Sequence, residues 1–424
     1  IGLSPPAGDG LAQGLGPEPA PAGATRTMGG DALLLGSSFS LAGEAPGGGS
    51  LAFWGRGAAS RFDGRQGGLA VDGEATGAML GTDWRHGRWT AGLVLAHSLG
   101  EGGYRDGADE AARGTIEATL TGLYPWLRHK LGERLEAWGA AGYGRGGLTL
   151  DPADGPAVEA DLALWMAAGG LRGTLLEPGG GLALTGRTDV MIAGASTAAA
   201  GSGVHRLAAV DGEATRLRLG LEGALPVDLG EGSLLTPGFE LGARHDGGDA
   251  ETGFGADIGA SLAWTDAASG LAVELRARGL LAHEAAGFRE RGLSGAVSWQ
   301  PGTAGRGPRL SLAQSLGGGS SGGAGALLGR TTLEGLGGQG GGELRSRRLE
   351  ARLGYGFAAL GDRFTATPEA GLALSSAGRQ YSIGWRLARR PGPGTAELAL
   401  EARRSESANA PPTHHARARL TARF

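Results

Sequence analysis

The last eleven residues, His414–Phe424 (HHARARLTARF), alternate between polar and apolar side chains. The apolar set is Ala416, Ala418, Leu420, Ala422 and Phe424, and the polar set is His415, Arg417, Arg419, Thr421 and Arg423. Only an extended strand places alternate residues on opposite faces, so this pattern predicts a β-strand. A strand of about ten residues, apolar on one face and closed by an aromatic residue, is typical of outer-membrane β-barrels. We predict that the apolar face contacts lipid and that Arg417 and Arg419 face a water-filled lumen; the alternative is an edge strand of a soluble sandwich.

The same pattern repeats along most of the chain. From Ser50 to Phe424, alternating runs of about 10–18 residues are separated by turn residues, and no helical pattern interrupts them. A soluble sandwich explains any one of these runs, but it does not explain the whole succession. We therefore predict an all-β fold: a transmembrane antiparallel β-barrel of the bacterial outer membrane with about 18 strands, in a range of 12–20.

Several runs carry charges on one face only. In the run that begins at Leu271, for example, Val273 and Leu275 alternate with Glu and Arg. A charged side chain facing lipid costs about 2–4 kcal/mol at the bilayer midplane, so these charges are expected on the lumen wall. The expected lumen-facing charges, besides those of the terminal strand, are Arg216, Arg218, Glu222, Glu274, Arg276, Arg278, Glu350 and Arg352. Arg and Glu mixed on one wall are expected to form ion pairs between neighbouring strands.

Over most of the chain the connections between runs alternate in length, with short exceptions at Ala285 and Ala377. The short ones include Arg85–Gly87, Ala267–Ser269, Gly361–Asp362 and Pro391–Gly394, and the long ones Glu101–Asp109, Arg145–Pro156, Ala193–Gly203 and Gly317–Gly342. Short periplasmic turns and long external loops are typical of outer-membrane barrels, so we predict that Phe424 lies on the periplasmic side. Aromatic residues near the strand ends are expected at the boundary between lipid and water. They are Trp84, Trp89, Tyr124, Trp126, Tyr143, Trp264, Trp299, Tyr381 and Trp385.

Residues 1–49 differ from the rest of the chain. Gly16–Ala24 (GPEPAPAGA) is rich in Pro, Gly and Ala, which predicts a linker. Asp31–Leu41 (DALLLGSSFSL) reads either as a further strand or as a segment inside the barrel. An even number of wall strands returns both ends of the barrel to the periplasm, so we favour a pore-lying segment. The predicted domains are therefore residues 1–49, a linker with this segment, and residues 50–424, the barrel.

The composition argues against several classes of protein. Gly accounts for 87 of 424 residues without a collagen-like period, and the net charge of −4 argues against a nucleic-acid partner. The longest apolar run, Leu162–Leu171, is too short for a spanning helix. The chain contains no Cys, which excludes disulfides and thiolate metal sites. No signal peptide precedes Ile1, so we expect the chain to be part of a longer precursor.

The sequence predicts no catalytic, cofactor-binding or metal site. The eight His residues show no ligand spacing, and no G-x-S-x-G motif is present. Arg244–Asp249 (RHDGGD) places two carboxylates in a Gly-rich stretch. We interpret it as an external turn rather than a calcium site, because an oxygen cage for calcium needs more ligands. We therefore expect no enzymatic activity.

Four stretches carry a resemblance to a known family: Leu51–Gly64 (LAFWGRGAASRFDG), Leu80–Leu99 (LGTDWRHGRWTAGLVLAHSL), Leu135–Gly144 (LEAWGAAGYG) and Leu235–Gly255 (LTPGFELGARHDGGDAETGFG). With Phe424 they resemble the C-terminal translocator domain of autotransporters, the proteins of type V secretion. The resemblance implies an outer-membrane barrel that carries its own N-terminal passenger to the cell surface. It also implies that the barrel-assembly machinery recognises the terminal strand, with Leu420 and Phe424 as its assembly signal. The family's twelve-stranded barrel around a pore helix has fewer strands than the runs indicate here.

Three functions follow from these expectations. The first is a translocator and surface anchor for an upstream passenger, with outer-membrane lipid, the assembly machinery and the passenger as partners. The second is a stand-alone pore, because a barrel this wide encloses an aqueous channel unless something fills it. The third is a structural or adhesive surface barrel whose external loops bind a partner.

Overall fold

The computed structural model describes residues 38–45, 47–66, 69–106, 113–153, 155–177, 181–201, 209–249, 252–284, 291–302, 305–317, 347–375, 378–389, 395–407 and 410–423. The first ten strands are β1 (Ser38–Glu44), β2 (Ser50–Gln66), β3 (Leu69–His86), β4 (Trp89–Asp106), β5 (Arg113–Lys130), β6 (Leu135–Pro152), β7 (Val158–Leu176), β8 (Ala183–Thr197), β9 (Val210–Ala224) and β10 (Val227–Gly230). The others are β11 (Ser233–Gly248), β12 (Gly253–Asp266), β13 (Leu271–His283), β14 (Arg291–Trp299), β15 (Gly307–Gly317), β16 (Arg347–Ala359), β17 (Phe364–Ser375), β18 (Gly378–Arg389), β19 (Thr395–Ser407) and β20 (Ala410–Arg423). In the described part of the chain, no helix is long and apolar enough to cross a bilayer.

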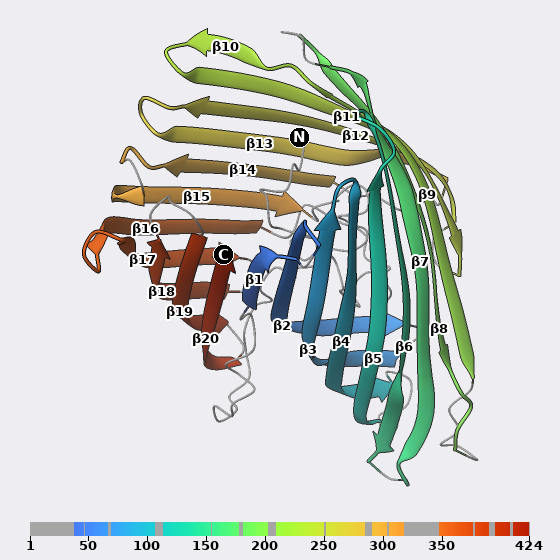
Figure 1. Ribbon diagram of the computed structural model, residues 1–424. Coiled ribbons are helices and arrows are strands. Elements are labelled where there is room, and N and C mark those ends of the chain that lie inside the picture. The colour runs from blue at the N-terminus through green and yellow to red at the C-terminus, as the bar shows by residue number, and fades with distance from the viewer. Residues whose placement is uncertain are drawn as a thin grey trace.

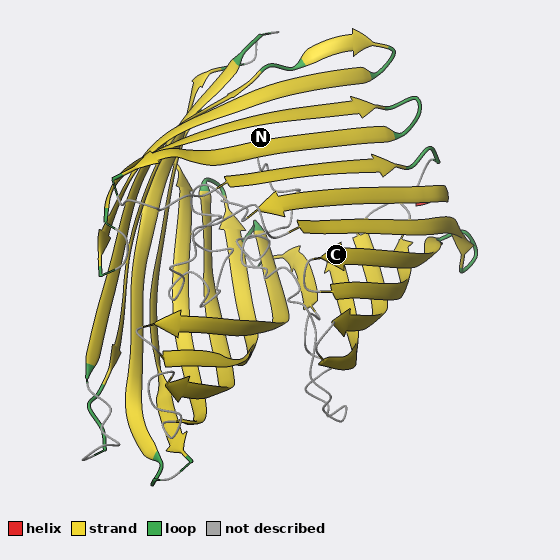
Figure 2. Ribbon diagram, turned by 180° about the vertical axis from the view of Figure 1, so that it is seen from behind, coloured by secondary structure: helices red, strands yellow, loops and turns green. Residues whose placement is uncertain are grey.

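These strands form a closed all-β barrel with 19 strands in its ring (Figure 1). Successive strands pair antiparallel, except that β9 pairs directly with β11, and the four-residue β10 borders β11 alone. The ring closes where β1 pairs in parallel with β20. Figure 2 shows the same wall from behind, built of strands throughout. The alternating runs of the sequence correspond to β2–β9 and β11–β20, so the predicted fold class is confirmed.

The nineteenth strand of the ring is β1, and it corrects the prediction of a pore-lying segment. Ser38–Glu44 lies in the wall between β2 and β20, beside both in Figure 1. Its residues alternate, with Phe39 and Leu41 on the exposed face. Both edges of β1 are paired, which satisfies backbone groups that would otherwise need water. Parallel closure is what allows an odd number of strands to form the ring. Asp31–Ser37 lies outside the described residues.

The two faces of the wall have opposite chemistry. On β9, Leu217 and Leu219 are 44% and 53% exposed, whereas Arg218 between them is only 5% exposed. The same inversion recurs around the ring, because the large exposed apolar residues sit at alternate positions of nearly every strand. Water-soluble proteins have the reverse arrangement, with charges outside and apolar side chains inside. The exposed face is therefore apolar and the enclosed face polar.

On β4–β7 the exposed face changes from apolar to polar along a single row of paired residues. Leu95, Leu123, Tyr143 and Trp165 pair in register across the four strands, and all are exposed. The next row, away from the tight turns, contains His97, Thr121 and Arg145. Beyond it the exposed residues include Glu101, Arg113 and Glu117. The strands thus extend past the apolar band on one side only.

This extension corrects three of the predicted external loops. β4 continues to Asp106, β6 to Pro152 and β8 to Thr197, each inside a stretch that was expected to be loop. Gly and Asp residues mark turns in many sequences, but here neighbouring strands continue to pair through them. Most of Gly317–Gly342 lies outside the described residues. The short connections at 87–88 and 267–270 agree with the prediction.

Candidate functional site

The enclosed face is the candidate functional site, and its first part is aromatic. Trp54 of β2 and Trp126 of β5 pack with Val94 in a buried cluster, against which Met79 and Tyr124 also pack. The prediction that Tyr124 and Trp126 lie at the lipid boundary is therefore wrong. Their neighbours Leu123 and Leu127 occupy the exposed face instead, and alternation then turns both aromatic rings inward.

Glycines on the neighbouring strands make room for these rings. A Cβ atom added to Gly81 would overlap the indole of Trp54, and one added to Gly92 would overlap the indole of Trp126. The ring of Tyr124 lies in the same way against Gly122 and Gly142. Large side chains on alternate strands thus lie flat against backbone. This part of the inner wall is packed and mostly apolar, with the buried Asp83 beside Trp54 as a charged exception.

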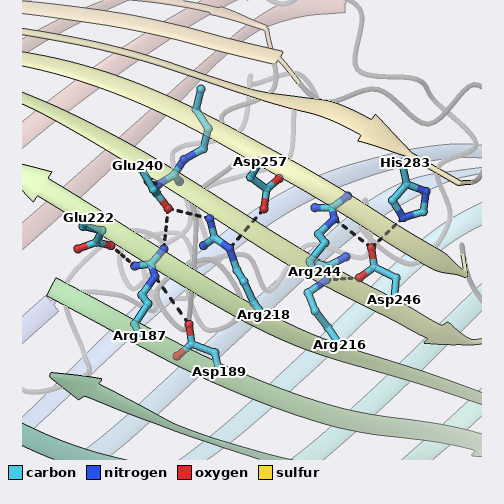
Figure 3. A network of polar contacts seen from close by, with 11 residues as sticks. Arg187, Asp189, Arg216, Arg218, Glu222, Glu240, Arg244, Asp246, Asp257 and His283 are labelled. Atoms are coloured by element: carbon cyan, nitrogen blue, oxygen red, sulfur yellow. Dashed lines mark hydrogen bonds and ion pairs between the residues drawn. The ribbon is translucent and has the colours of Figure 1, made fainter. Parts of the chain in front are cut away.

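The second part of the enclosed face holds a network of charges on β7–β9 and β11–β13, called here the central network (Figure 3). It consists of Arg172, Arg187, Arg218 and Arg278 with Asp189, Glu222, Glu240 and Asp257. Glu240 is its hub: it accepts from Arg187 at 2.8 Å, from Arg218 at 2.7 Å and from Arg278. Four positive and four negative groups balance one another. Most are nearly buried, which is tolerable because each charge has a partner.

Glycine again explains how these side chains meet. Glu240 on β11 and Arg278 on β13 both pair with Gly259 of the intervening β12, and they join above it. Arg187 on β8 likewise reaches Glu240 across β9, where its register partner is Gly220. A Cβ atom added to Gly220 would lie 3.2 Å from the side chain of Arg187, and one added to Gly259 would lie 3.2 Å from the side chain of Glu240. The small residues let ion pairs span alternate strands.

A smaller group surrounds Asp246 and corrects the interpretation of Arg244–Asp249 as a turn. Arg244–Gly248 belongs to β11. The carboxylate of Asp246 is 2.5 Å from Arg216 and 3.1 Å from Arg244, and His283 of β13 lies 3.3 Å away. The carboxylate of Asp246 is thus already paired with two arginines. No set of three His, Asp or Glu residues suited to a metal ion occurs in the part of the chain that the structure describes.

A third group of charges, the Glu401 cluster, lies on β16, β19 and β20. Glu401 of β19 is 2.6 Å from Arg417 and 3.5 Å from Arg352, and it also accepts from Arg403. Arg352 is in turn 2.6 Å from Glu350 on its own strand. The cluster therefore links strands that are distant in the sequence; Arg352 and Arg417, for example, are 65 residues apart. It borders a recess of about 400 Å³.

The sequence-predicted charges fall into these groups or beside them. Arg216 joins the Asp246 group; Arg218, Glu222 and Arg278 join the central network; Glu350, Arg352 and Arg417 join the Glu401 cluster. Glu274 and Arg276 form a pair at 2.5 Å that is about half exposed. Arg419 lines the recess. Leu420 is on the exposed face, and Phe424 lies outside the described residues.

Several members of the central network, including its hub Glu240, were not predicted from the sequence. Glu240 sits in an alternating stretch, Phe239–Arg244, in which Phe239 and Leu241 are apolar, so its face was detectable. Arg187 and Asp189 lie two residues apart on one face, and Asp257 precedes Ile258, but each is flanked mainly by Gly, Thr or Ala, so the local alternation is weak. Their partners come from strands whose register is not encoded locally. The groups themselves offer charge pairing and anion contact, and no nucleophile–base pair is evident among them.

No protein-family model matches the chain, and no curated protein sequence matches it. Among solved structures, the ferric preacinetobactin receptor BauA of Acinetobacter baumannii is 9% identical, with a TM-score of 0.43, 90% of this chain and 78% of that chain covered. The translocator domain of the autotransporter NalP of Neisseria meningitidis is 17% identical, with a TM-score of 0.32, covering 55% of this chain and 81% of that one. The β domain of the Bordetella autotransporter BrkA is 20% identical, with a TM-score of 0.32, covering 54% and 91%. Similarity at this level assigns no function.

Proposed function

We propose that this chain is an outer-membrane barrel that carries an upstream passenger to the cell surface and anchors it there. The exposed apolar face supports the membrane location, because so large an apolar surface is unfavourable in water. A closed ring of strands also satisfies its own backbone groups, as a bilayer requires. The partners of the protein would then be outer-membrane lipid, the barrel-assembly machinery and the passenger.

The asymmetry of the strands supports one orientation in the membrane. β4–β7 extend beyond the apolar row at one end, and at the other end they are joined by turns at 87–88 and 131–134. Outer-membrane barrels have short periplasmic turns and longer external parts. The proposal therefore puts the tight turns and Arg423 on the periplasmic side, and the polar extensions of β4–β7 outside the cell.

The observation that carries the translocator function is the direction of β1. Because β1 is parallel to β20, both strands run toward the end with the tight turns. β1 begins beside Arg419 and reaches the turn that leads into β2. In a ring closed by antiparallel pairing alone, the first strand would run away from the periplasm. β1 itself runs toward the periplasmic end, and this direction supports an external position for the segment that precedes it.

Surface display of a fused passenger tests this proposal. An epitope-tagged reporter with an export signal is placed ahead of Ile1 in a Gram-negative host. We expect antibody to stain the tag on intact cells and added protease to remove it. The matched control carries the same tag in the turn at Gly87–Arg88, where it should become accessible only after the outer membrane is broken.

Two results would oppose the proposal. A barrel that is assembled and heat-modifiable but keeps its upstream tag hidden in intact cells would rule out passenger display. Staining of the tag at Gly87–Arg88 in intact cells would invert the assigned orientation. In either case the barrel fold would stand, and only its function would need revision.

A second candidate, a stand-alone pore, is favoured by the charged part of the enclosed face. Barrels of 16–18 strands leave an aqueous channel, and this ring has 19. Purified protein in planar bilayers would then give stable, stepwise ion conductance without any passenger. A closed, non-conducting barrel that displays its passenger would favour the translocator instead.

A further inference from the structure

The recess on the inner wall between β15 and β20 has an unbalanced charge. Its volume is about 400 Å³, within the range of small-molecule sites. Its charged lining consists of Arg309, Arg352, Arg386, Arg403, Arg417 and Arg419 with Glu350, Glu369, Glu397 and Glu401. Among the described residues of the lining, six arginines face four glutamates, which is a surplus of two positive charges. The buried central network, in contrast, is balanced.

Two of the four glutamates of the recess, Glu401 and Glu369, are each shared between arginines. Glu401 forms ion pairs with three arginines, Arg352, Arg403 and Arg417. Glu369 lies 3.1 Å from Arg386 and 3.7 Å from Arg309, so two guanidinium groups share a single carboxylate. A guanidinium group has five N–H donors, far more than a shared carboxylate can accept. The arginines of the recess therefore have more N–H donors than these two carboxylates can accept.

Arg419 extends the positive region beyond the Glu401 cluster. It is an exposed residue of β20 that pairs with Ser38 of β1, and Ser38 pairs on its other side with Arg56 of β2. Two arginines therefore flank a short polar residue on the enclosed face at the seam of the ring. The two guanidinium groups repel one another, which adds to the positive character of this part of the wall.

We propose that this recess binds a compact oxyanion with at least two negative charges, such as a small molecule bearing phosphate or carboxylate groups. The planar forks of arginine match both groups with paired hydrogen bonds. The charge of such a ligand offsets the surplus of two. The proposal goes beyond the translocator function and does not depend on a passenger.

Calorimetric titration of the purified barrel in neutral detergent micelles tests the site. The probes are inorganic pyrophosphate and citrate, each added at low salt without divalent cations. The variants Arg386→Gln and Arg419→Gln each remove one charge of the recess. Arg276→Gln is the matched control, because Arg276 lies on the same enclosed face but pairs with Glu274 outside the recess.

We expect saturable binding by the wild type, weakened about tenfold by either recess variant, as for the loss of one charge-assisted hydrogen bond. Arg276→Gln should bind as the wild type does. Binding of pyrophosphate alone assigns a phosphate ligand, and binding of citrate alone assigns a carboxylate. Absence of saturable binding for both probes would overturn the proposal, as would an equal loss in Arg276→Gln. Arg419 has no ion pair in the Glu401 cluster, so Arg419→Gln separates lost binding from lost folding.

Discussion

Two glycines of β4 occupy the same enclosed face but have very different surroundings. A Cβ atom at Gly92 would overlap the indole of Trp126 and stand 2.6 Å from the backbone oxygen of Thr82. A Cβ atom at Gly100 would meet nothing closer than 3.8 Å. Gly92→Ala should therefore lower the free energy of unfolding by about 1–3 kcal/mol, the usual cost of overpacking. Gly100→Ala should leave it nearly unchanged.

The measurement is reversible unfolding by guanidinium of barrel refolded into vesicles, followed by tryptophan fluorescence. Because Trp126 itself must move, its emission should shift in folded Gly92→Ala but not in Gly100→Ala. Equal stability of the two variants would mean that Trp126 does not lie against β4 in the way described.

Two glutamates on the enclosed face differ in the same way. Glu240 is 13% exposed and holds three arginines, whereas Glu274 is 44% exposed and pairs with Arg276 alone. Glu240→Gln leaves buried positive charges without their counter-charge, which costs about 3–5 kcal/mol. Glu274→Gln should cost about 0–1 kcal/mol, as for exposed pairs. Unfolding midpoints of the two variants compare them directly, and similar midpoints would speak against a structural role for the central network.

The pairing of β1 with β20 predicts a cross-link that distinguishes a strand of the wall from a segment lying in the pore. Ser40 of β1 lies directly opposite Thr421 of β20. Adjacent paired residues fall within the distance that a disulfide spans, and the chain has no Cys of its own to interfere. The double variant Ser40→Cys, Thr421→Cys should therefore cross-link under mild oxidation, which circularises the barrel and changes its mobility on a gel.

The control is Ser40→Cys with Ser382→Cys, since β18 is separated from β1 by β19 and β20. It should stay reduced under the same conditions. A cross-link in the control but not between positions 40 and 421 would return Ser38–Glu44 to the lumen, as the sequence first suggested.

The terminal strand carries the proposed assembly signal. Loss of Phe424 removes at most about 3 kcal/mol of apolar burial, which a closed ring should tolerate once folded. Deleting Phe424 should nevertheless sharply reduce the amount of barrel in the outer membrane, if the assembly machinery reads the aromatic end. The same variant refolded into detergent should still give a compact, heat-modifiable band. Normal amounts of the deletion variant in cells would leave Phe424 without an assembly role.

At the scale of the whole molecule, the alternation of side chains was sufficient to predict an all-β barrel. Each strand reports its own two faces, as Arg218 between Leu217 and Leu219 illustrates. Closure was not predictable in the same way. β1 contributes only a few alternating residues, and its parallel pairing with β20 depends on a partner more than 370 residues away. Such a long-range pairing cannot be predicted from the local sequence.

The candidate site was predictable only in part, for a related reason. Residues such as Arg278 and Arg352 could be placed on the enclosed face, but their partners could not be named. Glu240 meets Arg278 because both strands pair with Gly259, a fact of register rather than of spacing. Tyr124 and Trp126 were placed on the wrong face because aromatic residues near strand ends resemble a boundary belt. Their alternation with Leu123 and Leu127 was the better guide.

We predict that the apolar face of this ring contacts lipid and that the charged face lines a water-filled lumen. Single cysteines at two neighbouring positions of β13, Leu275→Cys and Arg276→Cys, test it most directly in barrels reconstituted in vesicles. Leu275 is on the exposed face, and Arg276 is on the enclosed one. We predict that a water-soluble maleimide labels position 276 and not 275, and that a fluorophore at 275 alone is quenched by lipid-attached quenchers. Labelling of position 275 with protection of 276 would contradict the account.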